Sequence, residues 1–487
     1  MGRVTEPNQV LPVPPADLPA TLGALRAAGH HYRTVKQELR DNLLARLRAG
    51  GDRFPGIVGY DDTVLPEVER ALLAGHDMVL LGERGQGKTR LIRSLVALLD
   101  EWTPVIAGSV LNEHPMHPLT PASRALAAEA GDDLPVNWLH RSMRYGEKLA
   151  TPDTSVGDLI GDVDPIRIAQ GRTLGDPETI HFGLVPRTNR GIFAVNELPD
   201  LAERIQVALL NVLEERDIQV RGYQLRLPLD LLLVASANPE DYTNRGRIIT
   251  PLKDRFGAEI HTHYPLGLEL ELALIRQEAD LVADVPEHVL EVLARFARAV
   301  RDSPSVDQRS GVSARFAIAA AETVAAAALR RSGLLAADAT TDGVREETPV
   351  ARVGDAVSVT STLRGKVEFE SGEDGREVEI LAHLLRTATA DTFRARLAGL
   401  DLSGFTALVD DGRVVETGEL VASADLLRQV GTVPGLAKAL DRLGLGDAPT
   451  PEQAAAGVEF VLEGLHLTRR LGKDVTESGR TVYGGRG

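Results

Sequence analysis

The stretch from Asp77 to Leu99 constrains the fold more than any other part of the chain. Residues 78–81 are all apolar, which predicts a short buried strand. Residues 82–89 follow and fit the phosphate-binding loop pattern, in which two glycines are separated by four residues and followed by lysine and threonine. Apolar residues then recur at helical spacing up to Leu99. This order of strand, glycine-rich loop and helix favours a phosphate-binding loop over a plain glycine-rich turn.

The chemistry of phosphate binding explains the residue types in this loop. Glycines allow successive backbone N–H groups to surround a phosphate, and a helix that begins there directs its positive end at the same anion. Lys88 is expected to reach the β- and γ-phosphates of a nucleotide, and the Thr89 hydroxyl is expected to bind Mg²⁺. The expected nucleotide-binding residues are Gly82, Glu83, Arg84, Gly85, Gln86, Gly87, Lys88, Thr89 and Arg90.

A second polar site is expected at the end of another apolar strand, Ile192–Val195, where Asn196 and Glu197 follow. In nucleotide-hydrolysing sites such a strand presents an aspartate to the Mg²⁺ shell and a glutamate to the attacking water. Asn196 keeps an oxygen but lacks the charge, which predicts weaker metal binding. Glu197 remains available as a general base. The alternative interpretation is an ordinary buried strand with a solvated acid at its end.

The fold class follows from the spacing of the apolar runs. Further buried strands are expected at 105–109, 231–237 and 260–264, with helical patterns between them. Such alternation predicts an α/β fold, in which a parallel sheet is covered by helices on both faces. Hairpins are expected around Gly222 and, with a short helix as the alternative, within 159–187. Asn238 follows the 231–237 strand directly.

Length and composition limit the remaining possibilities. The 487 residues suggest about two to four domains. A net charge of −16 counts against a broad nucleic-acid-binding surface. The absence of cysteine excludes disulfides and thiolate chemistry, and His114, His117 and His140 do not have the spacing of metal ligands. We see neither a signal-peptide pattern nor an apolar run long enough to span a bilayer, and we expect a cytoplasmic protein without membrane insertion.

In the C-terminal part, strands are expected at 357–360 and 366–370, and helices at 378–397, 422–431 and 451–467. The expected domain organisation of the whole chain has six parts. The parts are an extended tail (1–33), an α/β nucleotide-binding domain (34–265) with inserts at 112–150 and 151–190, a helical lid (266–336), a linker (337–356), a mostly helical C-terminal domain (357–472) and a second tail (473–487).

Over residues 54–330 the chain resembles the AAA+ ATPases, in particular the group that contains the magnesium-chelatase ATPase subunit and the MoxR-type ATPases. The resemblance names each motif: Phe54–Gly59 before the core, Gly82–Thr89 as Walker A, 151–190 as the helix-2 insert, Ile192–Glu197 as Walker B, 217–227 as the hairpin before sensor 1, Asn238 as sensor 1, Asp254-Arg255-Phe256 as the arginine-finger turn, and Gly311–Arg315 as sensor 2.

The resemblance implies an enzyme that binds ATP and Mg²⁺ in a homo-oligomeric ring, commonly a hexamer. Arg255 would then reach the γ-phosphate held by the neighbouring subunit, and Arg315 would respond to it from the lid. Asn238 would hold the attacking water. A partner protein with a von Willebrand factor A domain is also implied, and the expected function is ATP-driven remodelling, or metal loading, of such a partner.

Two other functions remain open at this point. Asn196 could make hydrolysis so slow that the protein is an ATP-switched scaffold. The chain could also be a DNA-acting AAA+ protein that grips nucleic acid with Arg221 and Arg226 of the hairpin, although its acidic charge makes nucleic acid an unlikely partner.

Overall fold

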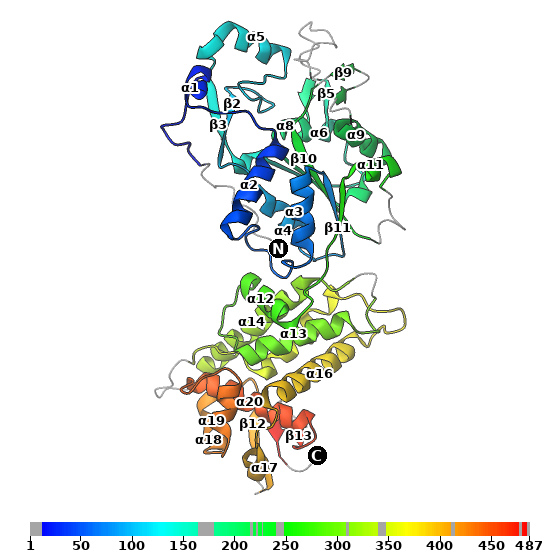
Figure 1. The fold of residues 1–487 in the computed structure, drawn as a ribbon. Coiled ribbons are helices and arrows are strands. Elements are labelled where there is room, and N and C mark those ends of the chain that lie inside the picture. Colours follow the sequence, from blue (N-terminus) through cyan, green and yellow to red (C-terminus); the bar gives the residue numbers. More distant parts are fainter. Residues whose placement is uncertain are drawn as a thin grey trace. The chain divides into compact units, whose positions relative to one another are not determined.

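The computed structural model divides the chain into two compact units (Figure 1). The first comprises Met1–Glu83 and Gly87–His263, and the second comprises Arg84–Gln86 and Tyr264–Gly487. The residues that the structure describes are 12–163, 180–214, 218–220, 223–225, 227–239, 248–307, 311–338, 347–410, 414–476 and 480–484.

A five-stranded parallel sheet forms the centre of the first unit, in the order β11-β1-β10-β7-β4. Its inner strands are wholly buried, as expected for a parallel sheet with both faces covered. The predicted α/β fold class is therefore confirmed. The strands are β1 (Met78–Leu81), β4 (Tyr145–Leu149), β7 (Gly191–Asn196), β10 (Leu231–Ala237) and β11 (Ala258–His261).

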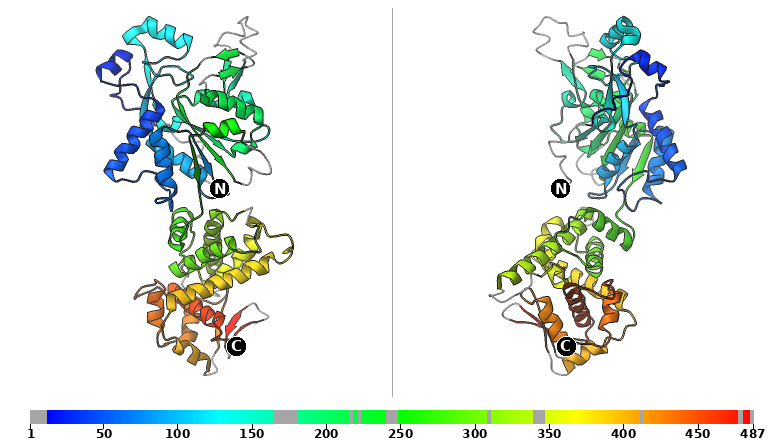
Figure 2. Two further views of the ribbon diagram at one scale, coloured as in Figure 1. Left: turned by 45° about the vertical axis from the view of Figure 1, so that its right-hand side comes forward. Right: turned by 90° about the vertical axis from the view of Figure 1, so that its left-hand side faces the viewer.

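Helices cover both faces of this sheet (Figure 2). Alternate residues of each strand point to opposite faces, so Ile192 and Ala194 enter one apolar cluster while Phe193 and Val195 enter the other. The helices over the first face are α2 (Val35–Ala49), α3 (Val64–Ala74) and α4 (Lys88–Ser94), and those over the second include α9 (Glu203–Glu214) and α11 (Thr250–Arg255).

One strand of the sheet was assigned to the wrong segment from the sequence. The apolar run at 105–109 belongs to β2 (Trp102–Ile106), which pairs antiparallel with β3 (Val136–His140) outside the five-stranded sheet. Its expected place is taken by β4, from the segment read as an insert. β4 is the last strand in the sheet and carries two consecutive charged residues, Glu147 and Lys148, so it lacks the continuous apolar run that marks a central strand.

Small elements complete the first unit. The hairpin expected within 159–187 is present as β5 (Gly161–Val163) paired with β6 (Ile180–Phe182). The hairpin around Gly222 is present as β8 (Ile218–Val220) and β9 (Tyr223–Leu225), whereas Arg221 and Arg226 lie outside the described residues. The remaining helices are α1 (Leu22–Ala27), α5 (Pro121–Ala130), α6 (Val156–Leu159) and α8 (Leu184–Arg187).

A buried ion pair fixes the start of β4. Both guanidinium nitrogens at the end of Arg144 donate to the two carboxylate oxygens of Glu38 on α2, over 2.7 and 2.6 Å. Arg144 Nε donates to the Arg190 carbonyl, and the Asp100 backbone N–H donates to Glu38. The two side chains are 0% and 3% exposed, so each charge depends on the other for its stabilisation.

Removing one member of this pair should destabilise the first unit strongly. We expect Glu38→Gln to lower the free energy of unfolding by about 3–5 kcal/mol, because Arg144 would keep a buried charge without a counter-ion. Urea unfolding followed by tryptophan fluorescence reports on this unit alone, since the two tryptophans, Trp102 and Trp138, both lie in it. The control is Asp41→Asn, on the same helix as Glu38. It breaks an exposed ion pair with Arg33 and should cost less than about 1 kcal/mol. Equal losses in the two variants would contradict the prediction.

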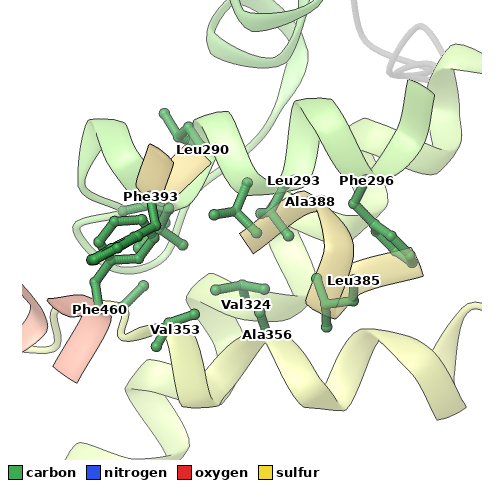
Figure 3. Close-up of a cluster of buried hydrophobic side chains, with 14 of the residues drawn as sticks. Leu290, Leu293, Phe296, Val324, Val353, Ala356, Leu385, Ala388, Phe393 and Phe460 are labelled. Carbon is green, nitrogen blue, oxygen red and sulfur yellow. The ribbon is translucent and has the colours of Figure 1, made fainter. Parts of the chain in front are cut away.

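The second unit is mostly helical and has one continuous apolar core (Figure 3). Phe296, Val324, Leu385 and Phe460 from four different helices meet in it. Its small sheet consists of β12 (Val415–Thr417), β13 (Lys473–Val475) and β14 (Thr481–Tyr483). The helices are α12 (Leu268–Glu278), α13 (Glu287–Arg301), α14 (Ala314–Asp338), α15 (Ser358–Thr362), α16 (Glu377–Leu397), α17 (Ser403–Asp410), α18 (Ser423–Val430), α19 (Leu436–Arg442) and α20 (Pro451–Leu467).

The strands expected at 357–360 and 366–370 are wrong. Val357 ends a 3₁₀ turn and residues 358–360 lie in the helix α15, while Lys366 ends a second 3₁₀ turn and Phe369 forms an isolated bridge with Val306. Val359 and Leu363 are both buried at the spacing of one helical turn. The hydroxyls of Ser358 and Thr360 donate to backbone carbonyls three residues earlier, which satisfies acceptors within a short helix. Within the described parts of the chain, no helix combines the length and apolar character needed to cross a membrane.

Candidate nucleotide-binding site

The glycine-rich loop connects β1 to α4 in the way the motif requires. Gly85 and Gly87 have φ values of +76° and +77°, a backbone conformation that side chains disfavour. Gly87 is the N-cap of α4, and the helix continues as a 3₁₀ turn over Leu95–Leu98. In general, the first backbone N–H groups of a helix have no helical acceptor, which is why the start of a helix suits an anion.

Lys88 is buried beneath this loop, with an exposed fraction of 7%. Its Nζ donates to the carbonyl oxygens of Gly82 and Glu83, the latter over 2.8 Å. A buried ammonium requires acceptors, and the loop supplies them. The lysine is therefore held at the loop, where phosphate oxygens would also find it.

Thr89 lies beside the end of β7. Its Oγ1 is 3.5 Å from Asn196 Oδ1, and the Ser236 hydroxyl of β10 donates to the same amide oxygen over 3.1 Å. The amide Nδ2 of Asn196 donates to Glu147 Oε1 over 2.6 Å. The structure therefore brings together Thr89 and Asn196, as the motifs imply, and adds a carboxylate from β4.

Glu147 is the centre of a wider network. Arg93, one helical turn after Thr89, donates to both of its oxygens over 2.8 and 3.0 Å, and the Tyr145 hydroxyl donates over 3.0 Å. Hydrogen bonding to Glu147 raises the pKa of Arg93, while burial and then the charge of Glu147 raise the pKa of Tyr145 above its ordinary value.

Glu197 and Asn238 directly follow the carboxyl ends of the neighbouring strands β7 and β10. The parallel register pairs Val195 of β7 with Ala235 of β10, so the residues after these strands emerge side by side. Glu197 adopts the left-handed conformation, with φ +55° and ψ +48°, and its N–H donates to Ser236 Oγ over 3.4 Å. A non-glycine residue in this region costs about 1 kcal/mol or more and is often found at functional sites.

The two arginines predicted from the motifs lie in different units. Arg255 ends α11 in the first unit, where its guanidinium forms an ion pair with Glu214 and its side chain is 47% exposed. Arg315 is exposed at the start of α14 in the second unit, and its N–H donates to Ser313 Oγ over 3.1 Å. Their contribution to hydrolysis stays a prediction.

Curated relatives match the chain over about half its length. Magnesium-chelatase subunit ChlI of Nostoc sp. is 30% identical over 235 residues, which is 47% of this chain and 59% of the relative. The magnesium-chelatase 38 kDa subunit of Cereibacter sphaeroides is 29% identical over 240 residues, 47% of this chain and 64% of the relative. The matched region is homologous to magnesium-chelatase subunits. It spans less than two thirds of the length of these relatives.

Structural comparison finds similar chains of low sequence identity. A model of the complex between the magnesium-chelatase subunits BchI and BchD is 24% identical, with a TM-score of 0.35, and covers 67% of this chain and 98% of that one. A Thermotoga maritima RuvB mutant is 12% identical, with a TM-score of 0.37, and covers 89% and 95%. Both TM-scores lie below 0.5. No protein-family model matches the chain.

The oxygen atoms at the end of β7 suit Mg²⁺. Mg²⁺ prefers oxygen ligands and is usually held by one or two protein groups together with substrate phosphates. Thr89 Oγ1 and Asn196 Oδ1 are such a pair. Over the ranges that the structure covers, no cluster of three or more His, Asp or Glu side chains is arranged to hold a metal ion by itself. His114 instead contacts the Tyr32 ring edge-on, and His117 lies tilted against the same ring.

Glu147 is the site residue that the sequence reasoning missed. It lies in a segment interpreted as an insert, and neither its spacing nor its neighbours match a nucleotide-binding motif. Residues 145–149 show neither a continuous apolar run nor a polar–apolar alternation, so no local pattern marks them as a strand.

Proposed function

We propose that the chain hydrolyses ATP at the carboxyl ends of β1 and β7. The observation that carries this proposal is the position of Thr89, in the first turn of the phosphate-loop helix, directly beside Asn196 at the end of β7. The loop would bind the triphosphate, and Thr89 and Asn196 would hold Mg²⁺. When bound, that ion would offset negative charge on the phosphate oxygens.

The reaction assigned to this site is in-line attack of water on the γ-phosphorus. Glu197 accepts a proton from the water as its oxygen bonds to phosphorus, and the bond from phosphorus to the bridging oxygen breaks to release ADP. Lys88 stabilises negative charge on the β- and γ-phosphates, and Asn238 orients the water. These roles rest on the motif positions, the shared sheet edge and the buried lysine.

We also propose that the protein works as a ring and acts on a partner protein. The exposed Arg255 fits a group that reaches the site of a neighbouring subunit, and the curated relatives are named as subunits. Remodelling or metal loading of a partner, with a hexameric ring and a partner that carries a von Willebrand factor A domain, is the specific form that the family resemblance favours.

Nucleotide binding is the first requirement of this function. We expect Lys88→Ala to weaken binding of a fluorescent ATP analogue about 100-fold, since charge-assisted hydrogen bonds to phosphate are each worth about 1.5–3 kcal/mol. Fluorescence anisotropy with Mg²⁺ present measures this. Lys438→Ala, at an exposed position on α19, is the matched control and should bind as the unaltered protein does. Unchanged affinity in Lys88→Ala would overturn the proposed site.

A further inference from the structure

We infer that Glu147 is a positioning residue that compensates for the asparagine at the end of β7. This inference rests on the proposed nucleotide site. In the proposed site the metal-facing group, Asn196, carries no charge, and the nearest carboxylate comes from the neighbouring strand instead. Glu147 and Asn196 together then have the charge of one aspartate, with the carboxylate next to the amide nitrogen of Asn196.

The hydrogen bonds fix which way the Asn196 amide faces. An ionised carboxylate only accepts hydrogen bonds, so Glu147 Oε1 must face the amide NH₂. The Ser236 hydroxyl donates to the opposite end, the amide oxygen, over 3.1 Å. With hydrogen bonds at both the nitrogen and the oxygen of the Asn196 amide, the amide oxygen is directed toward Thr89. Glu147 therefore selects the orientation in which the oxygen, and not the nitrogen, is available to a cation.

The register of the sheet makes this contact specific. Glu147 is paired with Ala194, and Ala194 and Asn196 point to the same face because they are two residues apart on β7. Glu147 and Asn196 are thus diagonal neighbours on adjacent strands. A shift of one residue would send Glu147 to the opposite face.

The ion pair with Arg93 does not cancel the effect of the Glu147 charge on Asn196. The Arg93 side chain is 59% exposed, whereas that of Glu147 is 20% exposed. Water therefore screens the arginine more than it screens the contact with Asn196. A charged acceptor also polarises the amide, which increases the negative charge on its oxygen.

A charge exchange between the two positions tests this inference. The variants are Asn196→Asp, Glu147→Gln and the double variant, with Glu129→Gln on α5 as an exposed control. The probe is a fluorescent ATP analogue, titrated with Mg²⁺ and, separately, in EDTA. Melting temperatures without nucleotide identify variants that fail to fold.

Each single variant should weaken Mg²⁺-dependent affinity about tenfold, which is about 1.4 kcal/mol. Asn196→Asp places two carboxylates in contact, which raises the cost of keeping both ionised, and Glu147→Gln removes the charge. The double variant restores one carboxylate and one amide, so it should return to within about threefold of the unaltered protein. Affinity in EDTA should not change.

Two results would overturn the inference while leaving nucleotide binding intact. One is tighter Mg²⁺-dependent binding by Asn196→Asp together with no effect of Glu147→Gln. The other is a double variant whose loss equals the sum of the two single losses. Failure of the unaltered protein to bind the analogue would instead reject the proposed function itself.

Discussion

Replacing Glu197 by glutamine should lower ATP turnover by a factor on the order of 10²–10⁴ while ATP affinity stays within about threefold. Glutamine keeps the size of the side chain but cannot accept the proton of the attacking water. The backbone at position 197 has the same left-handed conformation whether the residue is glutamate or glutamine. The cost of this conformation is therefore the same in the variant and in the unaltered protein. The expected loss is therefore specific to the chemical step.

Steady-state release of phosphate and binding of a fluorescent ATP analogue, measured on the same preparations, separate the two effects. Glu203→Gln, at an exposed position in the first turn of α9, is the control and should hydrolyse ATP normally. If the unaltered protein binds ATP yet turns over no faster than Glu197→Gln, the hydrolase proposal is wrong. The slow, ATP-switched scaffold would then be the better account.

Replacing Arg255 by alanine should reduce turnover on the order of 10³-fold, and only under conditions in which subunits assemble. An arginine supplied by a neighbouring subunit stabilises charge that develops on the γ-phosphate in the transition state. Its ground-state contact is with Glu214 at the surface, so ATP binding and folding should change little. Turnover per subunit should rise with protein concentration in the unaltered protein and stay flat in the variant.

Mixing two inactive variants gives the sharper test of Arg255. A ring that contains both Arg255→Ala and Glu197→Gln subunits has interfaces where one subunit supplies Glu197 and the other supplies Arg255. Random assembly should make about a quarter of the interfaces complete and restore activity in proportion, because a head-to-tail interface joins different surfaces of the two subunits. Arg48→Ala, exposed near the end of α2, is the single-variant control. Absence of recovery in mixed rings would contradict action between subunits.

The central fold could be predicted because its strands are continuous apolar runs. β1, β7 and β10 are buried along their whole length, and this burial requires the uninterrupted sequences from which they were identified. The phosphate loop was equally clear, since its glycines, lysine and threonine are required by backbone and phosphate chemistry and do not depend on distant contacts.

The missed features depend on contacts between distant segments. Tyr145–Leu149 is a strand because Arg144 is bound to Glu38 and because β7 offers its free edge, and neither fact is visible in the local sequence. Val359 and Leu363 fit a helix only once a core exists to bury them. Local patterns therefore located the centre of the site, whereas the carboxylate beside Asn196 required the three-dimensional arrangement.

The parallel register of β4 and β7 changes what a comparison of related chains should examine. Asn196 is paired with Leu149, and the carboxylate stands two positions before that partner, 49 residues from Asn196 along the chain. A search confined to the end of β7 would find an amide and miss the carboxylate beside it. Comparing β4 and β7 together, as paired strands, would include the carboxylate on the adjacent strand.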